Sequence, residues 1–307
     1  MPVSPVDLNN TNILITGPTG QVAAPIVDAL SKIANVTALA RFSKDSDKAA
    51  LESRGIKVIR ADLADKSSLQ ACPDEFDYVL NLAVVKSGNF AYDLAANGEG
   101  VGYLMARCKS AKAFLHFSST AVYEYAGHSP RKESDPLGDN HRAMFPTYSI
   151  AKIAAETVCR FAAKQFSIPT TIARLSVPYG NNGGWPYFHM LMMKENIPID
   201  IHPEGPNTYN LLHAEDYIEK IPYLLAAAST DVTTTNFGGS QAVSIEEWCG
   251  YITELTGFAP KFNEKASAFG SLSIDTTLMH ELIGETRVDW RDGIRAMLEN
   301  LAPQALK

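Results

Sequence analysis

Tyr148 and Lys152 stand four residues apart in the segment YSIAK. On a helix this spacing places both side chains on one face, where they can act on one substrate. A phenol with its ordinary pKa of about 10 exchanges protons poorly at neutral pH, but a neighbouring ammonium stabilises the phenolate and lowers that pKa. We therefore expect Tyr148 to exchange a proton with a carbonyl or alcohol oxygen, with Lys152 supplying the charge.

Hydroxyl groups cluster at a second point, where Ser118, Ser119 and Thr120 follow the apolar run AFLHFS. Open α/β sheets bind ligands at the carboxyl ends of their strands. One of these three hydroxyls is therefore expected to hold the substrate oxygen. A Ser/Thr-rich turn without function is the alternative.

The stretch GPTGQVAAP, residues 17–25, follows the apolar run ILI and supplies glycines where a chain must bend tightly around a pyrophosphate. Ala23 replaces the third glycine of the G-x-x-G-x-x-G pattern, at a position that serves helix packing rather than phosphate contact. The alternative is an ordinary glycine turn. The candidate pyrophosphate-binding residues in this turn are Gly17, Thr19 and Gly20.

The predicted second strand ends at Ala40, and Arg41, Ser43 and Lys44 follow it. In dinucleotide-binding folds a carboxylate at this point binds the ribose 2′-hydroxyl, whereas an arginine accommodates a 2′-phosphate. The residues here favour NADP as cofactor, with NAD possible. A solvated basic loop is the alternative.

These residues need a scaffold, and apolar runs alternating with helical patterns predict an α/β protein with a Rossmann-type, doubly wound parallel sheet. The expected strands are 12–17, 35–40, 57–62, 78–83, 113–118 and 170–175. The expected helices are 21–33, 45–54, 66–72, 91–110 and 148–166.

A change in texture after Leu175, where prolines and glycines crowd around aromatic residues, suggests a domain boundary. We predict a nucleotide-binding domain at 11–175 and smaller substrate-binding segments at 176–307. A strand at 234–239 would return the chain to the sheet within about 211–245. Helices at about 244–257 and 290–301 would complete the fold.

The net charge and composition of the chain limit which kinds of binding partner are expected. The formal net charge is -7 and no block of lysines or arginines occurs, so neither nucleic acid nor an anionic membrane is expected to bind. No basic leader and no apolar run of about 20 residues is present, which predicts a soluble, cytoplasmic protein. The four cysteines and seven histidines lack metal-binding spacing, so no metal is expected.

Several motifs occur in an order that resembles the extended short-chain dehydrogenase/reductase family, which includes nucleotide-sugar epimerases and dehydratases. They are TGPTGQVA (16–23), DL (62–63), NLA (81–83), NGEG (97–100), SSTAVY (118–123), YSIAK (148–152), ARLSVPYG (173–180), LLHAEDY (211–217) and IDTTLMHELIG (274–284).

The resemblance implies a catalytic group of Thr120, Tyr148 and Lys152, with Lys152 also holding the nicotinamide ribose. It implies that Gln21 and Val22 face the pyrophosphate, that Asp62 and Leu63 face the adenine and that Ser176 faces the nicotinamide. It also implies that Leu82, Ala83, Lys86 and Asn97 lie along the middle of the cofactor. Asp62 and Asn97 have a structural alternative, because either could cap a turn or helix. In the family, helices corresponding to 91–110 and 148–166 form a dimer interface, so a homodimer is expected.

The chain departs from the family pattern at positions that concern the substrate. Ala121 and Val122 replace the Asp-Glu pair of dehydratases, which disfavours dehydration. Val177 and Tyr209 stand where nucleotide-sugar enzymes carry an asparagine and an arginine for the diphosphate, and no arginine lies between Ala259 and Arg287. Aromatic residues and methionines crowd positions 185–193, which suits an apolar small molecule or, equally, a packed core.

Three functions are consistent with these residues. The leading hypothesis is an NAD(P)-dependent oxidoreductase that interconverts a carbonyl and a secondary alcohol on a small, non-nucleotide substrate. The second is an NAD-dependent epimerase of a sugar or nucleotide sugar, in which hydride leaves and returns on the opposite face. The third is an NADP(H) sensor without chemistry, which would have no need of Tyr148 and Lys152.

Overall fold

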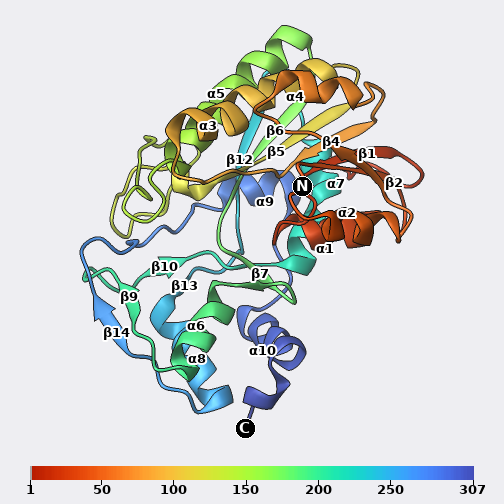
Figure 1. The fold of residues 1–307 in the computed structure, drawn as a ribbon. Helices are drawn as coiled ribbons and strands as arrows, with labels where there is room; N and C mark the ends of the chain where they lie inside the picture. Colours follow the sequence, from red (N-terminus) through yellow and green to blue (C-terminus); the bar gives the residue numbers. More distant parts are fainter. Residues whose placement is uncertain (1) are drawn as a thin grey trace.

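A seven-stranded parallel sheet forms the centre of the computed structural model, which describes residues 2–307 (Figure 1). The strand order is β12-β6-β5-β4-β1-β2-β3. Their bounds are β1 Asn12–Thr16, β2 Asn35–Ala40, β3 Lys57–Arg60, β4 Tyr78–Asn81, β5 Ala113–Ser119, β6 Thr170–Leu175 and β12 Thr233–Phe237. The chain reverses direction across the sheet between β1 and β4, and open α/β sheets form their ligand crevice at such a reversal.

Helices cover both faces of the sheet (Figure 1). Ile13 and Ile15 of β1 share a core with α1 (Ala23–Leu30), α7 (Ala214–Ala226) and α9 (Thr277–Ile283). Leu14, between them, points to the other face and shares a core with α4 (Gly100–Arg107) and α5 (Tyr148–Phe166). Alternate side chains of one strand therefore fill two cores, as expected of a sheet buried on both sides. The predicted Rossmann-type fold is confirmed.

Two crossover segments differ from the sequence prediction. Residues 66–72 form a 3-10 helix at Lys66–Ala71 rather than an α-helix. Asp65 accepts a hydrogen bond from the backbone N–H of Ser67, and the Ser68 hydroxyl donates to the carbonyl oxygen of Asp65. Such local side-chain bonds compete with α-helical pairing.

The predicted helix 91–110 is also not continuous. It divides into α3 (Phe90–Leu94), a π-helical turn (Ala95–Glu99) and α4. The π turn contains Asn97, which is one of the predicted cofactor residues, and π turns are frequent at functional sites. The remaining helix of this half, α2, spans Asp45–Glu52.

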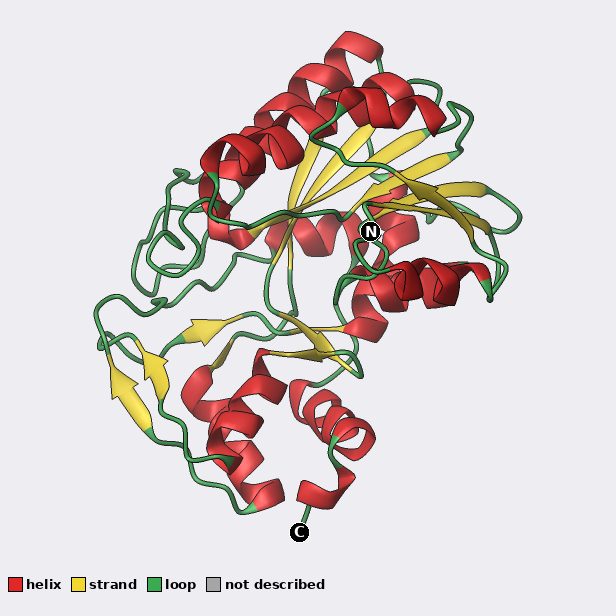
Figure 2. Cartoon of the chain, in the orientation of Figure 1, coloured by secondary structure: helices red, strands yellow, loops and turns green. Residues whose placement is uncertain are grey.

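After β6 the chain builds a second layer below the sheet, made of short strands and three helices (Figure 2). The helices are α6 (Trp185–Lys194), α8 (Ile245–Thr256) and α10 (Trp290–Leu301). They enclose a separate apolar core around the fully buried Trp248. The predicted domain boundary near residue 175 stays a prediction. The short strands are β7 Pro178–Gly180, β8 Gly183–Gly184, β9 Ile199–Ile201, β10 Thr208–Tyr209, β11 Leu212–His213, β13 Val243–Ser244 and β14 Phe262–Glu264.

The start of α8 offers a test of local stability. The Ser244 hydroxyl accepts a hydrogen bond from the backbone N–H of Glu247, and the Glu247 carboxylate accepts one from the backbone N–H of Ser244. This capping box satisfies two free N–H groups, so Ser244→Ala is expected to lower the free energy of unfolding by about 1 kcal/mol. Urea denaturation measures the loss, and Ser46→Ala, at an exposed position of α2, is expected to show none.

Within residues 2–307, none of the helices combines the length and the apolar character needed to cross a bilayer.

Candidate active site

A cleft of two joined pockets lies at the carboxyl edge of the sheet, around the reversal between β1 and β4. The first, here called the turn pocket, has a volume of about 310 Å³. Most of the predicted cofactor residues line it, namely Gly17, Thr19, Gly20, Arg41, Ser43, Lys44, Asp62, Leu63, Leu82, Ala83 and Asn97.

The second, here called the tyrosine pocket, has a volume of about 390 Å³. It shares Gly17, Gly20 and Leu82 with the turn pocket, so the two are continuous. Its other predicted residues are Gln21, Val22, Lys86, Thr120, Tyr148 and Ser176. The structure thus brings every predicted site residue except Lys152 onto the wall of one cleft.

The glycine turn has the geometry that a closely approaching ligand needs. Gly17 has φ of +66°, and a Cβ there would lie 2.8 Å from the Cα of Ala83. The backbone N–H of Gly20 donates to the carbonyl oxygen of Gly17 at 3.0 Å, which closes the turn before α1 begins at Ala23. Ala23, the first residue of α1, is buried in the core between this helix and the sheet, as expected for the packing position of the pattern. The turn therefore fits a bound pyrophosphate.

Thr16 fixes the opposite wall of the turn pocket. Its hydroxyl accepts hydrogen bonds from the backbone N–H groups of Leu82 and Ala83, at 3.1 and 3.0 Å, and donates to the Asn81 side chain at 2.6 Å. The residues after β4 are thereby held against Gly17. Sequence reasoning missed Thr16, although its place directly before the first glycine was a usable signal.

At the far end of the turn pocket a tyrosine joins two predicted residues. Arg41 donates to the Tyr92 hydroxyl at 2.6 Å, and that hydroxyl donates to Asp62 at 2.8 Å. Burial, together with the Asp62 carboxylate, raises the pKa of Tyr92, so the phenol remains protonated. Asp62 also accepts a hydrogen bond from the backbone N–H of Ala64, which matches the turn-capping alternative as well as the pocket position. No motif in the sequence pointed to Tyr92.

Asn97 supports the cleft indirectly. Its side-chain oxygen accepts from the backbone N–H of Val85, and its side-chain nitrogen donates to the carbonyl oxygens of Val85 and Asp93. These bonds fix the loop after β4, which carries Lys86. Asn97 therefore holds this loop in place and also lines the turn pocket, and its contact with a cofactor stays a prediction.

Tyr148 begins α5 and is partly exposed to the tyrosine pocket. Desolvation by the surrounding protein raises the pKa of its phenol. A hydrogen bond with the Ser119 side chain acts in the opposite direction but does not outweigh the desolvation. The prediction that the Lys152 charge dominates and lowers this pKa is therefore wrong for the cofactor-free protein. A neutral phenol is suited to donating a proton.

Lys152 lies behind the pocket rather than on its wall, and the residue is 5% exposed to solvent. Its ammonium donates to the carbonyl oxygen of Phe117 on β5 at 2.7 Å. Burial lowers the pKa of Lys152 to about 8, Glu156 opposes this by raising it, and Lys86 lowers it further. The ammonium is therefore bonded to the backbone of β5.

Aromatic side chains line part of the tyrosine pocket, here called the aromatic wall, and Phe269, which lies outside the lining, packs against two of them. Trp185 stacks on Phe269 with ring centres 5.8 Å apart, and His141 stacks on the same phenylalanine at 4.1 Å. Burial lowers the pKa of His141 to about 4, so this ring is neutral. Tyr209 and Phe145 complete the wall. Phe145 and Phe269 come from irregular segments, where no periodic pattern could place them.

Comparison with known proteins shows which folds and families this chain resembles. A search of curated protein sequences returned no match. Among solved structures, the UDP-glucuronic acid 4-epimerase from Bacillus cereus, in complex with UDP-glucuronic acid and NAD, is similar with a TM-score of 0.78 and 21% identity. That alignment covers 95% of this chain and 99% of the epimerase chain.

Two further structures have similar folds. The UDP-glucose 4-epimerase from Thermotoga maritima, with UDP-glucose, matches with a TM-score of 0.79 and 19% identity over 95% of this chain and 99% of that one. The enzyme WbmG from Bordetella bronchiseptica, with NAD and UDP, matches with a TM-score of 0.82 and 18% identity over 97% and 96%. At these identities the likeness concerns the fold.

A family model gives the decisive match. The model of the NAD dependent epimerase/dehydratase family matches residues 13–238, which include the glycine turn, the hydroxyl cluster and the YSIAK segment. The match spans most of the chain, and the fold agrees with it independently. The chain therefore belongs to the NAD dependent epimerase/dehydratase family.

Proposed function

We propose that the protein is a nicotinamide-dependent enzyme that interconverts a secondary alcohol and a carbonyl on a small molecule, with Tyr148 as acid and base. The observation that carries this proposal is the shared cleft. Tyr148, Thr120 and Ser119 line a pocket that is continuous with the glycine turn. A substrate oxygen between the phenol and these hydroxyls would face whatever the turn holds.

The residues divide the chemistry between them. Gly17, Gly20 and the start of α1 would hold the pyrophosphate, and Arg41 with Asp62 would hold the adenosine end. When bound, the cofactor supplies the hydride acceptor or donor. Tyr148 gives its proton to the carbonyl oxygen in one direction and takes a proton from the alcohol in the other. Thr120 or Ser119 would hydrogen-bond the same oxygen and fix its orientation.

Two outcomes can follow this first step. In one, the carbonyl product leaves the site, which gives net oxidation or reduction. In the other, the bound carbonyl intermediate rotates and receives hydride on its opposite face, which gives an epimer. The comparisons favour epimerisation, because the similar structures include epimerases whose complexes hold NAD and UDP sugars. We therefore propose the epimerase outcome ahead of net oxidoreduction.

The lining of the tyrosine pocket supports a substrate without a nucleoside diphosphate. Val177 and Tyr209, which replace the family's diphosphate ligands, both line this pocket. Lys86 is the one lysine or arginine on its wall within the described chain, and its ammonium lies over the Phe145 ring, 4.4 Å from the ring centre. Losing charge-assisted bonds to phosphate is costly, whereas an uncharged ring would pack well here.

An activity assay with chosen alcohols and sugars distinguishes the three outcomes. Purified protein is incubated with NAD or NADP and with UDP-glucose, UDP-glucuronic acid or trans-4-methylcyclohexanol, whose epimer is the cis isomer, while nicotinamide absorbance and substrate NMR are followed together. Conversion without net cofactor reduction supports the epimerase outcome, and stoichiometric reduction supports the oxidoreductase outcome. Binding of the dinucleotide without conversion of any alcohol or sugar in a broader panel would instead favour the sensor.

Arg41 is proposed to select NADP over NAD. Its guanidinium lies in the turn pocket beside Ser43 and Lys44, with no carboxylate at the end of β2. Charge-assisted bonds contribute about 1.5–3 kcal/mol, so Arg41→Ala is expected to weaken NADPH binding by about 10- to 100-fold and to leave NADH binding nearly unchanged. Nicotinamide fluorescence titration measures both. Arg54→Ala, on the same side of the sheet but outside this pocket, is the control, and equal losses for both dinucleotides would contradict the assignment.

The homodimer and the cytoplasmic location are also proposals. The dimer is supported by the outer face of α5, where Phe161 is 65% exposed.

A further inference from the structure

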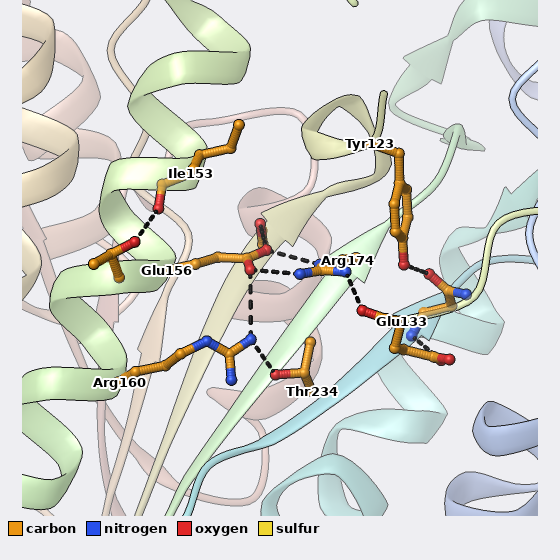
Figure 3. Close-up of polar contacts among 10 residues, drawn as sticks. Tyr123, Glu133, Ile153, Glu156, Arg160, Arg174 and Thr234 are labelled. Atoms are coloured by element: carbon orange, nitrogen blue, oxygen red, sulfur yellow. Dashed lines mark hydrogen bonds and ion pairs between the residues drawn. The ribbon is translucent and has the colours of Figure 1, made fainter. Parts of the chain in front are cut away.

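Charged side chains continue along α5 beyond the catalytic pair (Figure 3). Glu156 and Arg160 follow Lys152 at intervals of four residues, so all of them lie near one face of the helix. Glu156 is 2% exposed, which is rare for a carboxylate. The Glu156 carboxylate has no role in the proposed proton and hydride transfers.

The Glu156 carboxylate is fully paired inside the protein. Arg174 of β6 donates to it twice, from Nε at 2.9 Å and from Nη2 at 2.8 Å. The Ser118 hydroxyl of β5 donates to it at 2.6 Å. Arg174 in turn donates from Nη1 to the carbonyl oxygen of Glu133 at 2.9 Å (Figure 3). A buried charge with this many partners is held in one position.

These contacts attach α5 to the strand that carries the hydroxyl cluster. Lys152 binds the carbonyl oxygen of Phe117, and Glu156 binds the side chain of the next residue, Ser118. Ser118 and Arg174 are also partners across the register between β5 and β6. Ser119, which ends β5, and Thr120, which follows it, line the tyrosine pocket. The pair of contacts therefore sets how Tyr148 and Lys152 stand relative to these hydroxyls.

We propose that Glu156, clamped by Arg174, is a positioning residue that keeps Lys152 charged and in place behind the active site. Its significance for catalysis rests on the function proposed above, but its effect on Lys152 can be measured separately. The clamp supplies a negative charge one helical turn from Lys152 without exposing a carboxylate to the cleft.

The surroundings of Lys152 explain why such a charge is needed. Burial works against the ammonium, and the cationic Lys86 adds to this, whereas Glu156 raises the pKa of Lys152. His116 is buried and neutral, because desolvation and the Lys152 charge hold its pKa well below the usual value. The titratable or charged groups on the elements around Lys152 include Tyr148, Glu156 and Arg160 on α5, His116 on β5, Arg174 on β6, Lys86 after β4, Asp93 on α3, Glu99 in the π turn and Arg107 on α4.

The test is the titration of Lys152, followed by NMR of isotope-labelled lysine side chains and assigned with Lys152→Arg. Wild-type Lys152 is expected to titrate near its pKa of about 8. Glu156→Gln removes the negative charge and leaves Arg174 unpaired, so the midpoint is expected to fall by about one pH unit or more. NADH affinity should then decrease at a pH between the two midpoints, where the wild-type side chain is still charged.

Two further variants separate this effect from loss of folding. Glu156→Gln leaves a buried cation alone and can destabilise the protein, whereas replacing both partners with apolar residues is often tolerated. Glu156→Met combined with Arg174→Met is therefore expected to fold and to lower the Lys152 midpoint by less than Glu156→Gln does, because it removes the Arg174 cation together with the carboxylate. Arg160→Gln is the matched control, because this arginine is partly exposed and approaches Glu156 at 3.6 Å from the outer side. It is expected to leave the midpoint within about half a unit.

An unchanged Lys152 midpoint in a double variant that melts like the wild type would overturn the proposal. A shifted midpoint in that variant with no shift for Arg160→Gln would support it. A wild-type protein that fails to bind NADH would remove the proposed function instead, and the Lys152 titration would still decide whether Glu156 controls this lysine.

Discussion

Replacing Tyr148 with phenylalanine is expected to reduce conversion of the substrate by about 10²- to 10⁴-fold, the contribution typical of a positioned acid or base. The phenol lies on the wall of the tyrosine pocket and Ser119 contacts it. Phenylalanine preserves the ring that packs beside His141 and Phe145 and removes only the proton donor. NADH affinity is therefore expected to stay within a factor of a few.

The measurement combines two readouts on the same preparation. Nicotinamide fluorescence gives the dinucleotide affinity, and substrate NMR gives conversion of whichever probe the wild type converts. Tyr103→Phe is the control, because that hydroxyl binds Glu99 on the surface, outside the cleft. Full conversion by Tyr148→Phe would show that another group moves the proton.

Substituting Gly17 with alanine is expected to weaken dinucleotide binding by about 10²-fold or more. Two effects combine at this position. The positive φ of +66° costs an L-residue roughly 1–2 kcal/mol, and the new Cβ would lie 2.8 Å from the Cα of Ala83, where only backbone movement can relieve the contact. That movement would open the turn at the point where the two pockets join.

Gly55 provides a matched control for Gly17→Ala. It has φ of +76°, but a Cβ there would meet nothing within 4 Å, and it lies in neither pocket. Gly55→Ala should therefore show the conformational cost in urea denaturation, about 1 kcal/mol, with unchanged NADH affinity. If Gly17→Ala bound NADH as well as Gly55→Ala does, the turn would not be the pyrophosphate site.

Local patterns were sufficient to predict the sheet and the glycine turn. The runs around Ile13, Val79 and Leu115 are continuous and apolar, as parallel strands buried on both faces require, and each became a strand. The spacing of Gly17, Gly20 and Ala23 likewise follows from one short segment. Predictions of this kind succeed because the residues that determine the structure are neighbours in the sequence.

Properties that depend on tertiary contacts could not be predicted in this way. The sequence placed Lys152 one turn from Tyr148, but the carbonyl oxygen of Phe117, which binds its ammonium, comes from another element. The raised pKa of Tyr148 depends on how much protein surrounds the phenol. Stacking of Trp185 on Phe269 joins positions 84 residues apart, the first at the start of α6 and the second in an irregular segment that no periodicity constrains.

Electrostatics shows the same distinction. The helical spacing of Lys152, Glu156 and Arg160 is visible in the sequence, yet Arg174 reaches Glu156 only because β6 pairs with β5 beside the helix. A sequence-based prediction could place Glu156 on the correct face of a helix. It could not tell that this carboxylate is buried, paired and coupled to Lys152.

The most direct test of the account is dinucleotide binding in the cleft, measured by nicotinamide fluorescence with NADH and NADPH on wild type, Gly17→Ala and Gly55→Ala. We predict saturable binding to the wild type and to Gly55→Ala, and its loss in Gly17→Ala. Absence of binding by the wild type with either dinucleotide, from a preparation whose extracted small molecules also contain no nicotinamide by mass spectrometry, would contradict the account.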